Sequence, residues 1–227
     1  MKPEPITPFG RNMMKQILIY SDSLTWGIIP GTRNRLPFEK RWTGVLEHSL
    51  ALSQQKVRVI EDCLNGRRTV WDDPFKAGRN GLVGLAQRIE VSSPLALVVL
   101  MLGTNDFQRA HQNDAWSSAQ GVGALVDVVR QAPIEPGMAQ PKILVVCPPL
   151  IQEPKGDIAA KFLGGDLKCV GMGAAFAEVS KQKGCAFFDA QSVASSSAVD
   201  GIHLDEPQHH TLGAALAPVV LGLIGPS

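Results

Sequence analysis

The sequence predicts an α/β domain in which a parallel sheet of about five strands lies between two layers of helices. Short apolar or alternating segments typical of strands alternate along the chain with longer segments of helical periodicity. The 227 residues fit one domain, and a 44% share of hydrophobic residues against 19% charged residues favours a large buried core. A repeated strand–helix–strand order gives a parallel sheet covered on both faces.

Five segments have the composition of strands. Residues 16–20 come first, and residues 56–61 (KVRVIE) alternate between apolar and polar side chains. Residues 95–102 (LALVVLML) form a continuous apolar run, which is typical of a central strand buried on both faces. Residues 142–147 and 186–189 complete the predicted sheet.

Five longer segments separate or follow these strands and are predicted to be helices: residues 42–52, 81–90, 115–131, 167–183 and 207–224. Pro207 suits the first turn of the last helix, because proline lacks the N–H that is unpaired there in any case. We expect residues 15–227 to form a single domain. Residues 1–14 are expected to be a flexible N-terminal arm, since they carry three prolines in their first eight positions.

Composition and charge exclude several classes of protein. The chain has 22 Lys and Arg against 21 Asp and Glu, a net charge of +1, whereas proteins that bind nucleic acid usually show a basic excess. Its longest apolar runs are too short to span a bilayer, so we expect neither a nucleic-acid nor a membrane partner. The first residues lack an apolar stretch of signal-peptide length, and the four cysteines lack C-x-x-C spacing. We therefore expect a cytoplasmic protein.

Four polar clusters follow predicted strands: residues 21–27, 62–69, 103–106 and 200–203. Each alone has an ordinary structural explanation, such as a helix cap, a glycine turn, an Asx turn or a surface histidine. Because the carboxyl ends of parallel strands meet at one edge of a sheet, we expect all four clusters to gather there.

Acyl transfer is the chemistry that uses these residue types together. Ser23 is the candidate nucleophile, His203 the candidate base, and Asp200 the acid that orients the imidazole. The backbone N–H groups of Ser23 and Gly66 and the side-chain amide of Asn105 are candidate donors to an oxyanion. No metal or cofactor is expected, and the spacing of His203, His209 and His210 is not a metal-ligand pattern.

The four clusters resemble the conserved blocks of the SGNH hydrolases, also called GDSL esterases and lipases. The four residues of the family name match Ser23, Gly66, Asn105 and His203, and Asp200 matches the acid of the family's triad. Longer segments resemble the bacterial arylesterase, acyltransferase and carbohydrate acetylesterase branch, namely residues 22–27, 41–46, 72–74, 101–106 and 199–203. The resemblance implies a flavodoxin-like SGNH hydrolase fold and a homo-oligomer.

One position departs from the family pattern. The usual Gly-Asp-Ser-Leu is Ser21-Asp22-Ser23-Leu24 here, which makes Ser21 a rival nucleophile. Ser23 is favoured because it holds the family's position before Leu24.

The resemblance implies a serine esterase for short-chain, acetyl-type esters such as aryl acetates or acetylated carbohydrates, with acyl transfer to alcohols as a further outcome. The alternatives are a thioesterase or lysophospholipase of the same family and a catalytically silent carbohydrate-binding module.

Other residues near the clusters are candidates for substrate binding: Asp22, Trp26, Phe162 and Ile202. For Trp26 a place in the core is the more common role of an aromatic residue, and Asp22 is expected to order the loop that holds Ser23. Arg67 and Arg68 are expected to be a solvated or interface pair. The partners implied are a small-molecule ester and further copies of the chain.

Overall fold

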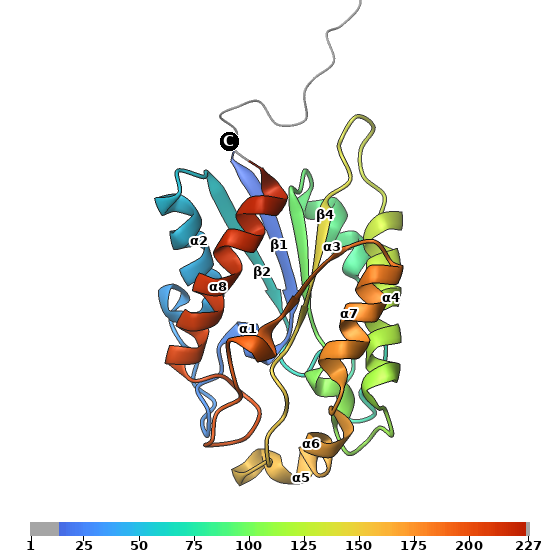
Figure 1. Ribbon diagram of the computed structural model, residues 1–227. Coiled ribbons are helices and arrows are strands. Elements are labelled where there is room, and N and C mark those ends of the chain that lie inside the picture. The colour runs from blue at the N-terminus through green and yellow to red at the C-terminus, as the bar shows by residue number, and fades with distance from the viewer. Residues whose placement is uncertain (1–13, 226–227) are drawn as a thin grey trace, which may run out of the picture.

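The computed structural model describes residues 14–225, so all of the predicted N-terminal arm except Met14 lies outside the described residues. Its centre is a sheet of five parallel strands in the order β2-β1-β3-β4-β5 (Figure 1). The strands are β1 Lys15–Ser21, β2 Val57–Cys63, β3 Leu97–Met101, β4 Lys142–Cys147 and β5 Ala186–Asp189. The predicted parallel α/β class is confirmed.

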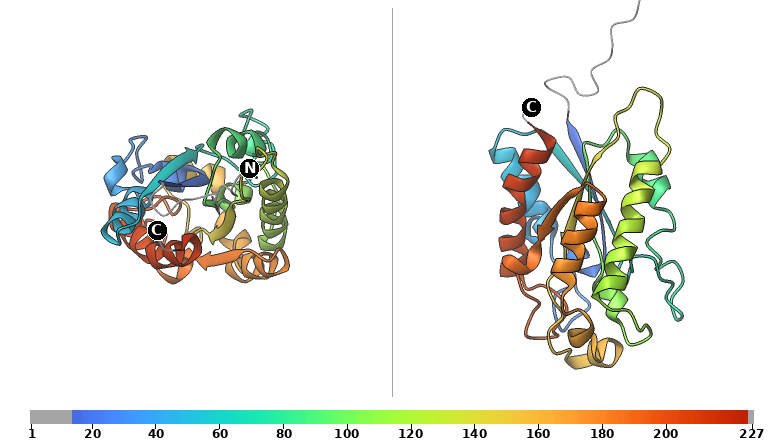
Figure 2. Two further views of the ribbon diagram at one scale, coloured as in Figure 1. Left: turned by 90° about the horizontal axis from the view of Figure 1, so that it is seen from above. Right: turned by 45° about the vertical axis from the view of Figure 1, so that its right-hand side comes forward.

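Helices cover both faces of the sheet. Figures 1 and 2 show α2 and α8 on one face and α3, α4 and α7 on the other. The α-helices are α1 Ser23–Trp26, α2 Trp42–Leu52, α3 Leu85–Ser92, α4 Ala115–Gln131, α5 Ala159–Phe162, α6 Gly165–Lys168, α7 Met172–Gln182 and α8 Glu206–Ile224. The 3-10 turns are η1 Phe38–Lys40, η2 Thr104–Phe107, η3 Gly156–Ile158 and η4 Ala190–Ser192. Among the described helices, none has both the length and the apolar character needed to cross a bilayer.

Alternation along the strands divides the core into two layers. On β1, Ile17 and Ile19 pack with α2 and α8, whereas Leu18 and Tyr20 pack with α3, α4 and α7. All five residues of β3 are buried, as expected of a central strand between two helical layers. The sheet therefore has no solvent-facing side at its centre, and polar groups collect at its ends.

Two predicted helices have different limits in the structure. The helix predicted over residues 81–90 begins only at Leu85, after Gly84 with a φ of 87°. The helix predicted over residues 167–183 is two helices, because Gly171 with a φ of 84° separates α6 from α7. Both glycines adopt the left-handed conformation that interrupts a helix, which a pattern of apolar residues does not reveal.

The carboxyl ends of the strands form the edge where the polar clusters lie. Ser23 lies two residues after the end of β1, and residues 62–69 begin at the end of β2. Residues 103–106 follow β3, and residues 200–203 lie in the loop before α8. The short helices α5 and α6 lie beyond this end of the sheet (Figure 1). The topology therefore brings four separate segments to one site.

Candidate active site

Ser23 is the first residue of α1 and lies at the end of β1. The side chain of Asp22 caps α1 by accepting the N–H of Leu24 at 2.9 Å. Ser23 Oγ is 3.2 Å from Nε2 of His203 and faces a cleft. Ser21, the rival serine, is fully buried, and its hydroxyl donates to the carbonyl of Met101 at 2.6 Å. The fold thus presents Ser23, and not Ser21, to solvent.

His203 is held from its other side by Asp200. Nδ1 of His203 is 2.7 Å from Oδ2 of Asp200, and Oδ1 of Asp200 accepts the backbone N–H groups of Ile202 and His203, each at 2.9 Å. Burial raises the pKa of Asp200, but these hydrogen bonds outweigh it and lower the pKa to about 2. An ionised Asp200 fixes the tautomer in which Nδ1 carries the proton and Nε2 is free to accept one from Ser23.

Three N–H donors surround the space beside Ser23 Oγ. Within the described residues, neither the backbone N–H of Ser23 nor that of Gly66 donates to another protein group. Gly66 has a φ of 85°, a conformation that favours glycine. Asn105 donates one Nδ2 hydrogen to Oδ2 of Asp22 at 2.8 Å, which leaves its second hydrogen for a ligand in the cleft.

A chain of buried polar groups fixes the Asn105 amide. Gln108, three residues further along the same turn, donates from Nε2 to Oδ1 of Asn105 at 2.7 Å. Arg68 donates to Oε1 of Gln108 and is 2.9 Å from a carboxylate oxygen of Asp73. Gln108 is not among the site residues predicted from the sequence. Its position three residues after Asn105 is the feature that could have indicated a contact between the two side chains.

The prediction that Arg67 and Arg68 form a solvated or interface pair is wrong. Arg68 is fully buried and Arg67 is 6% exposed. Arg67 bonds the carboxylate of Asp62 at 2.6 Å and places its guanidinium 3.8 Å from the ring centre of Tyr20. Both arginines are therefore structural cations whose charges are paired inside the protein, because an unpaired buried charge would be costly.

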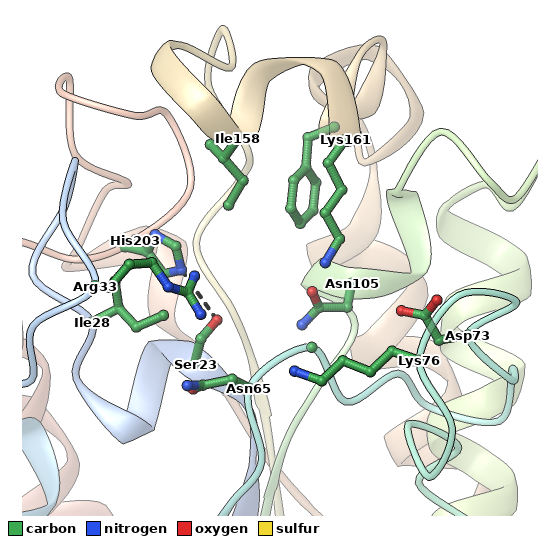
Figure 3. A pocket seen from close by; sticks show the side chains of 12 residues that line it. Ser23, Ile28, Arg33, Asn65, Asp73, Lys76, Asn105, Ile158, Lys161 and His203 are labelled. Carbon is green, nitrogen blue, oxygen red and sulfur yellow. Dashed lines mark hydrogen bonds between the residues drawn. The ribbon is translucent and has the colours of Figure 1, made fainter.

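The cleft at Ser23 is small, with a volume of about 70 Å³. Its lining is shown in Figure 3 and consists of Ser23, Ile28, Arg33, Asn65, Gly66, Asp73, Lys76, Asn105, Ile158, Lys161, Phe162 and His203. Of the four predicted substrate-binding residues, Phe162 lines this cleft. Its ring also packs in the apolar core, so it forms a fixed wall.

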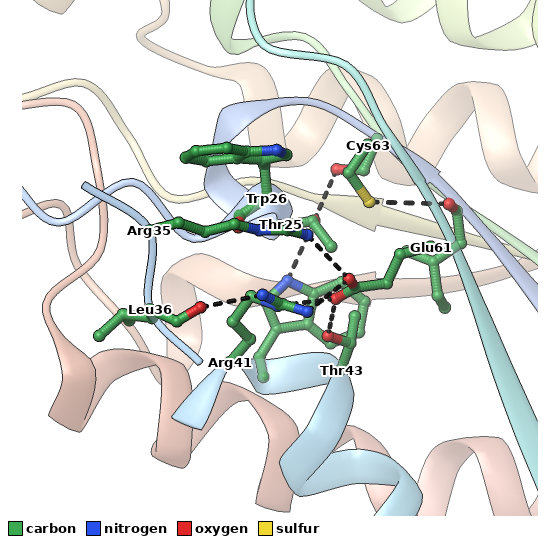
Figure 4. A network of polar contacts seen from close by, with 11 residues as sticks. Thr25, Trp26, Arg35, Leu36, Arg41, Thr43, Glu61 and Cys63 are labelled. Atoms are coloured by element: carbon green, nitrogen blue, oxygen red, sulfur yellow. Dashed lines mark hydrogen bonds and ion pairs between the residues drawn. The ribbon is translucent and has the colours of Figure 1, made fainter. Parts of the chain in front are cut away.

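Asp22, Trp26 and Ile202 do not line the cleft, contrary to expectation. Asp22 lies beneath it and accepts the amide of Asn105, and Ile202 points into the core. Trp26 contacts Arg35, whose guanidinium carbon is 4.7 Å from the centre of a Trp26 ring (Figure 4). These three residues position the loops of the site instead of forming its walls.

A network centred on Glu61 secures the loop between α1 and α2 (Figure 4). Glu61, in β2, accepts from Arg35 at 3.1 Å, from Arg41 at 2.8 Å and from the hydroxyl of Thr43. Arg41 also donates to the carbonyl of Leu36 at 2.9 Å. These contacts therefore fix the part of the loop that follows Arg33.

Comparison with known proteins assigns the family. Residues 22–210 match the GDSL-like Lipase/Acylhydrolase family, a range that includes Ser23, Gly66, Asn105, Asp200 and His203. The chain belongs to this family. It is a carboxylic ester hydrolase of the SGNH type, as the resemblance of its sequence implies. The chain has no match among curated protein sequences.

Solved structures of related proteins agree with this assignment. A carbohydrate acetylesterase family member from Sinorhizobium meliloti is 34% identical, with a TM-score of 0.87 over 93% of this chain and 99% of that one. The aryl esterase of M. smegmatis is 36% identical, with a TM-score of 0.86 over 92% of this chain and 99% of that one. A lipase/acylhydrolase from Enterococcus faecalis, at 16% identity and a TM-score of 0.65 over 94% of this chain and 98% of that one, shares the fold.

Proposed function

We propose that this hydrolase is a serine esterase that acts through an acyl-enzyme. The observation that supports it most directly is the continuous contact from Asp200 to His203 to Ser23, at 2.7 Å and 3.2 Å, at the cleft. Nε2 of His203 takes the proton of Ser23 as Oγ attacks the ester carbonyl carbon. The same proton then passes to the leaving alcohol oxygen as the ester C–O bond breaks.

The tetrahedral intermediate carries a negative oxygen that needs donors. The N–H groups of Ser23 and Gly66 and the second Nδ2 hydrogen of Asn105 are available for it. Water then attacks the acyl carbon, His203 takes a proton from that water, and the acid leaves as Ser23 regains its hydrogen. An added alcohol in place of water would give acyl transfer by the same step.

The proposed substrates carry a short acyl group of the acetyl type. The volume of about 70 Å³ at Ser23 is less than half of the roughly 150 Å³ of an apolar cavity that accepts benzene. Phe162 and Ile158 limit the cleft, and both belong to or pack against the apolar core. Aryl acetates and acetylated carbohydrates are the proposed classes, in line with the aryl esterase and carbohydrate acetylesterase to which the chain is similar.

The test is the hydrolysis of p-nitrophenyl acetate by the wild type and by Ser23→Ala. We expect kcat to fall by at least about 10³-fold, because removal of a nucleophile disables the whole triad. Ser21→Ala is the matched control and should keep most of the activity, since this hydroxyl bonds only buried protein groups. Comparable turnover by Ser23→Ala and the wild type would refute the proposed nucleophile.

A thioesterase or lysophospholipase with longer acyl chains is the second candidate. A larger cleft of about 640 Å³ adjoins the site, shares Lys76 and Lys161 with it, and is lined in part by Phe75, Ala110 and Ala160. Rates for p-nitrophenyl esters from acetate to decanoate separate the two candidates. A steady decline with chain length supports the acetyl-type esterase, and a maximum at eight or more carbons supports the second candidate.

A further inference from the structure

A second cleft opens directly beside His203 and carries three basic side chains. It has a volume of about 390 Å³ and shares four residues with the cleft at Ser23: Arg33, Ile158, Lys161 and His203. Lys155 adds a third cation, and the carboxylates in its lining are Asp157 and Asp200. Asp200 is bonded to His203, and Lys155 pairs with Glu153 at 3.7 Å. Asp157 is therefore the carboxylate of the lining that is left to oppose Arg33 and Lys161.

Arg33 is held over the cleft by an ordered loop. The N–H of Ile29 donates to the carbonyl of Asn34 at 3.0 Å, and the hydroxyl of Thr32 donates to the carbonyl of Ile29 at 2.8 Å. The N–H of Gly31 is 3.4 Å from Oδ2 of Asp200, which ties this loop to the candidate triad. Figure 3 shows the guanidinium of Arg33 close to Ser23 and His203.

Lys155 pairs with a carboxylate oxygen of Glu153 at 3.7 Å, but the other cations at this mouth have no protein partner in the described part of the chain. Among the described residues, no salt bridge or hydrogen bond involves the side chains of Arg33, Lys76 or Lys161. Asp73, which lines the cleft at Ser23, is paired with the buried Arg68 at 2.9 Å. The arrangement therefore leaves a positive potential at the entrance of a protein whose net charge is only +1.

The pKa of Lys161 is lowered by burial and, to a smaller extent, by neighbouring cations. Burial lowers it most, the nearby carboxylate of Asp73 raises it, and the charges of Arg68, Lys76 and Arg33 lower it further. Three cations thus act on Lys161 against one carboxylate. A bound anion would relieve that repulsion.

The proposed reaction decides which part of the substrate faces these cations. His203 must deliver its proton to the leaving oxygen, so the alcohol portion of the ester lies on the side of His203, where the second cleft opens. We propose that the alcohol portion of the preferred ester carries an anionic group, a carboxylate or a phosphate, that Arg33 and Lys161 bind. This inference rests on the proposed serine esterase function. Arginine suits the role because its planar guanidinium bonds two oxygens of such a group at once.

Matched acetate esters test the inference. The wild type is assayed with 4-acetoxybenzoate, 4-acetoxyphenyl phosphate and the neutral 4-acetoxybenzamide, and each kcat/KM is divided by the alkaline hydrolysis rate of the same ester. At low salt we expect the anionic esters to exceed the neutral one by about tenfold or more. Added NaCl should reduce this ratio, because the cations lie at an open mouth. The larger of the two anionic ratios assigns the group as a carboxylate or a phosphate.

Charge variants identify the residues responsible. Arg33→Gln combined with Lys161→Gln should lower the anionic-to-neutral ratio about tenfold, and Lys161→Glu should invert the preference. Lys181→Gln removes the same charge from an exposed position on α7, outside both clefts, and should leave the ratio unchanged. An equal ratio in the wild type and the double variant would overturn the inference.

A second comparison separates this inference from the proposed function. If the wild type cleaves 4-acetoxybenzamide, Ser23→Ala does not, and the anionic esters show no advantage, the anion site is wrong and the serine esterase stands. If Ser23→Ala cleaves 4-acetoxybenzamide as fast as the wild type, the proposed function fails and the inference fails with it.

Discussion

The amide of Asn105 shows how much of this site depends on residues that never face the substrate. Its oxygen accepts a hydrogen bond from Gln108, and one of its Nδ2 hydrogens is donated to Asp22. These two bonds fix the amide plane, and with it the direction of the second Nδ2 hydrogen. A donor fixed before the reaction stabilises an oxyanion without any cost of reorganisation. We therefore propose that Gln108 positions Asn105.

Gln108→Glu tests this positioning role. The glutamate keeps an oxygen for Arg68 but replaces the donor to Asn105 Oδ1 with a second acceptor. We expect kcat for p-nitrophenyl acetate to fall about tenfold or more with little change in KM, since a single oxyanion donor contributes roughly 10²–10³-fold. Gln131→Glu makes the same change at an exposed residue at the end of α4 and should have no effect. Equal kcat values for Gln108→Glu and the wild type would show that Asn105 is fixed without Gln108.

Asp22 is a buried carboxylate whose ionisation opposes folding. Burial raises its pKa to about 6, against the lowering effects of the Leu24 N–H, of His203 and Asn105, and of Arg67. Because the folded state holds this proton more tightly than the unfolded chain, the contribution of Asp22 to stability decreases as pH rises from about 4 to 6.

Asp22→Asn removes that charge and should change the pH dependence of stability. Relative to the wild type, the variant should gain about 1–3 kcal/mol in free energy of unfolding between pH 4 and pH 8. Urea unfolding of both proteins at the two pH values measures the difference. Asp114→Asn is the control, because hydrogen bonds from Ser117 lower the pKa of Asp114. The stabilising effect of Asp114 is lost only below about pH 4, so this variant and the wild type should change alike between pH 4 and pH 8. If the free energies of unfolding of Asp22→Asn and the wild type differ by the same amount at both pH values, the raised pKa of Asp22 is contradicted.

At the scale of elements, the contact between α2 and α8 holds the loop of His203 in place. His209, in the first turns of α8, accepts the N–H of Trp42 through Nδ1 at 3.2 Å. Gly213, one turn later, lies so close to α2 that a Cβ there would be 2.5 Å from the carbonyl oxygen of Trp42. The two helices can approach this closely only because residue 213 has no side chain.

Gly213→Ala should separate the helices and destabilise the protein. We expect the free energy of unfolding to fall by about 1–3 kcal/mol, as is usual for overpacking, even though alanine is the better helix former. Gly222→Ala in the same helix meets nothing within 4 Å and should stabilise the protein slightly. Urea unfolding measures both variants, and equal effects from the two would refute the close approach as the cause.

The whole molecule exposes large apolar side chains that its own core does not use. Phe75 is 87% exposed and Trp116 is 67% exposed, so neither is a core residue. Exposed apolar groups of this size are typical of interaction surfaces. We propose that they contribute to a homo-oligomer, as the family resemblance implies.

Light scattering tests this assembly. The wild type should show a mass that is a multiple of the single chain, and Phe75→Ser combined with Trp116→Ser should reduce it. Val91→Ser, which changes another exposed apolar residue on α3, is the control and should keep the mass of the wild type. A single-chain mass for the wild type at high protein concentration would reject the proposal.

The sequence by itself determined the parallel sheet, the order of its elements and the candidate catalytic residues. Apolar periodicity and the positions of polar residues after strands are local properties that can be read along the chain, as for β3 and for Ser23, Asn105 and His203. The chain order also predicted that these residues would meet at one edge of the sheet.

Only the tertiary structure decided which neighbours support that site. The burial of Arg68, the hydrogen bond from Asn105 to Asp22 and the convergence of Arg33 and Lys161 all depend on contacts between segments distant in sequence. The sequence does not show whether an arginine will lie in solvent or be paired with a carboxylate inside the protein. Its surroundings, which set its charge environment and its function, exist only after the chain has folded.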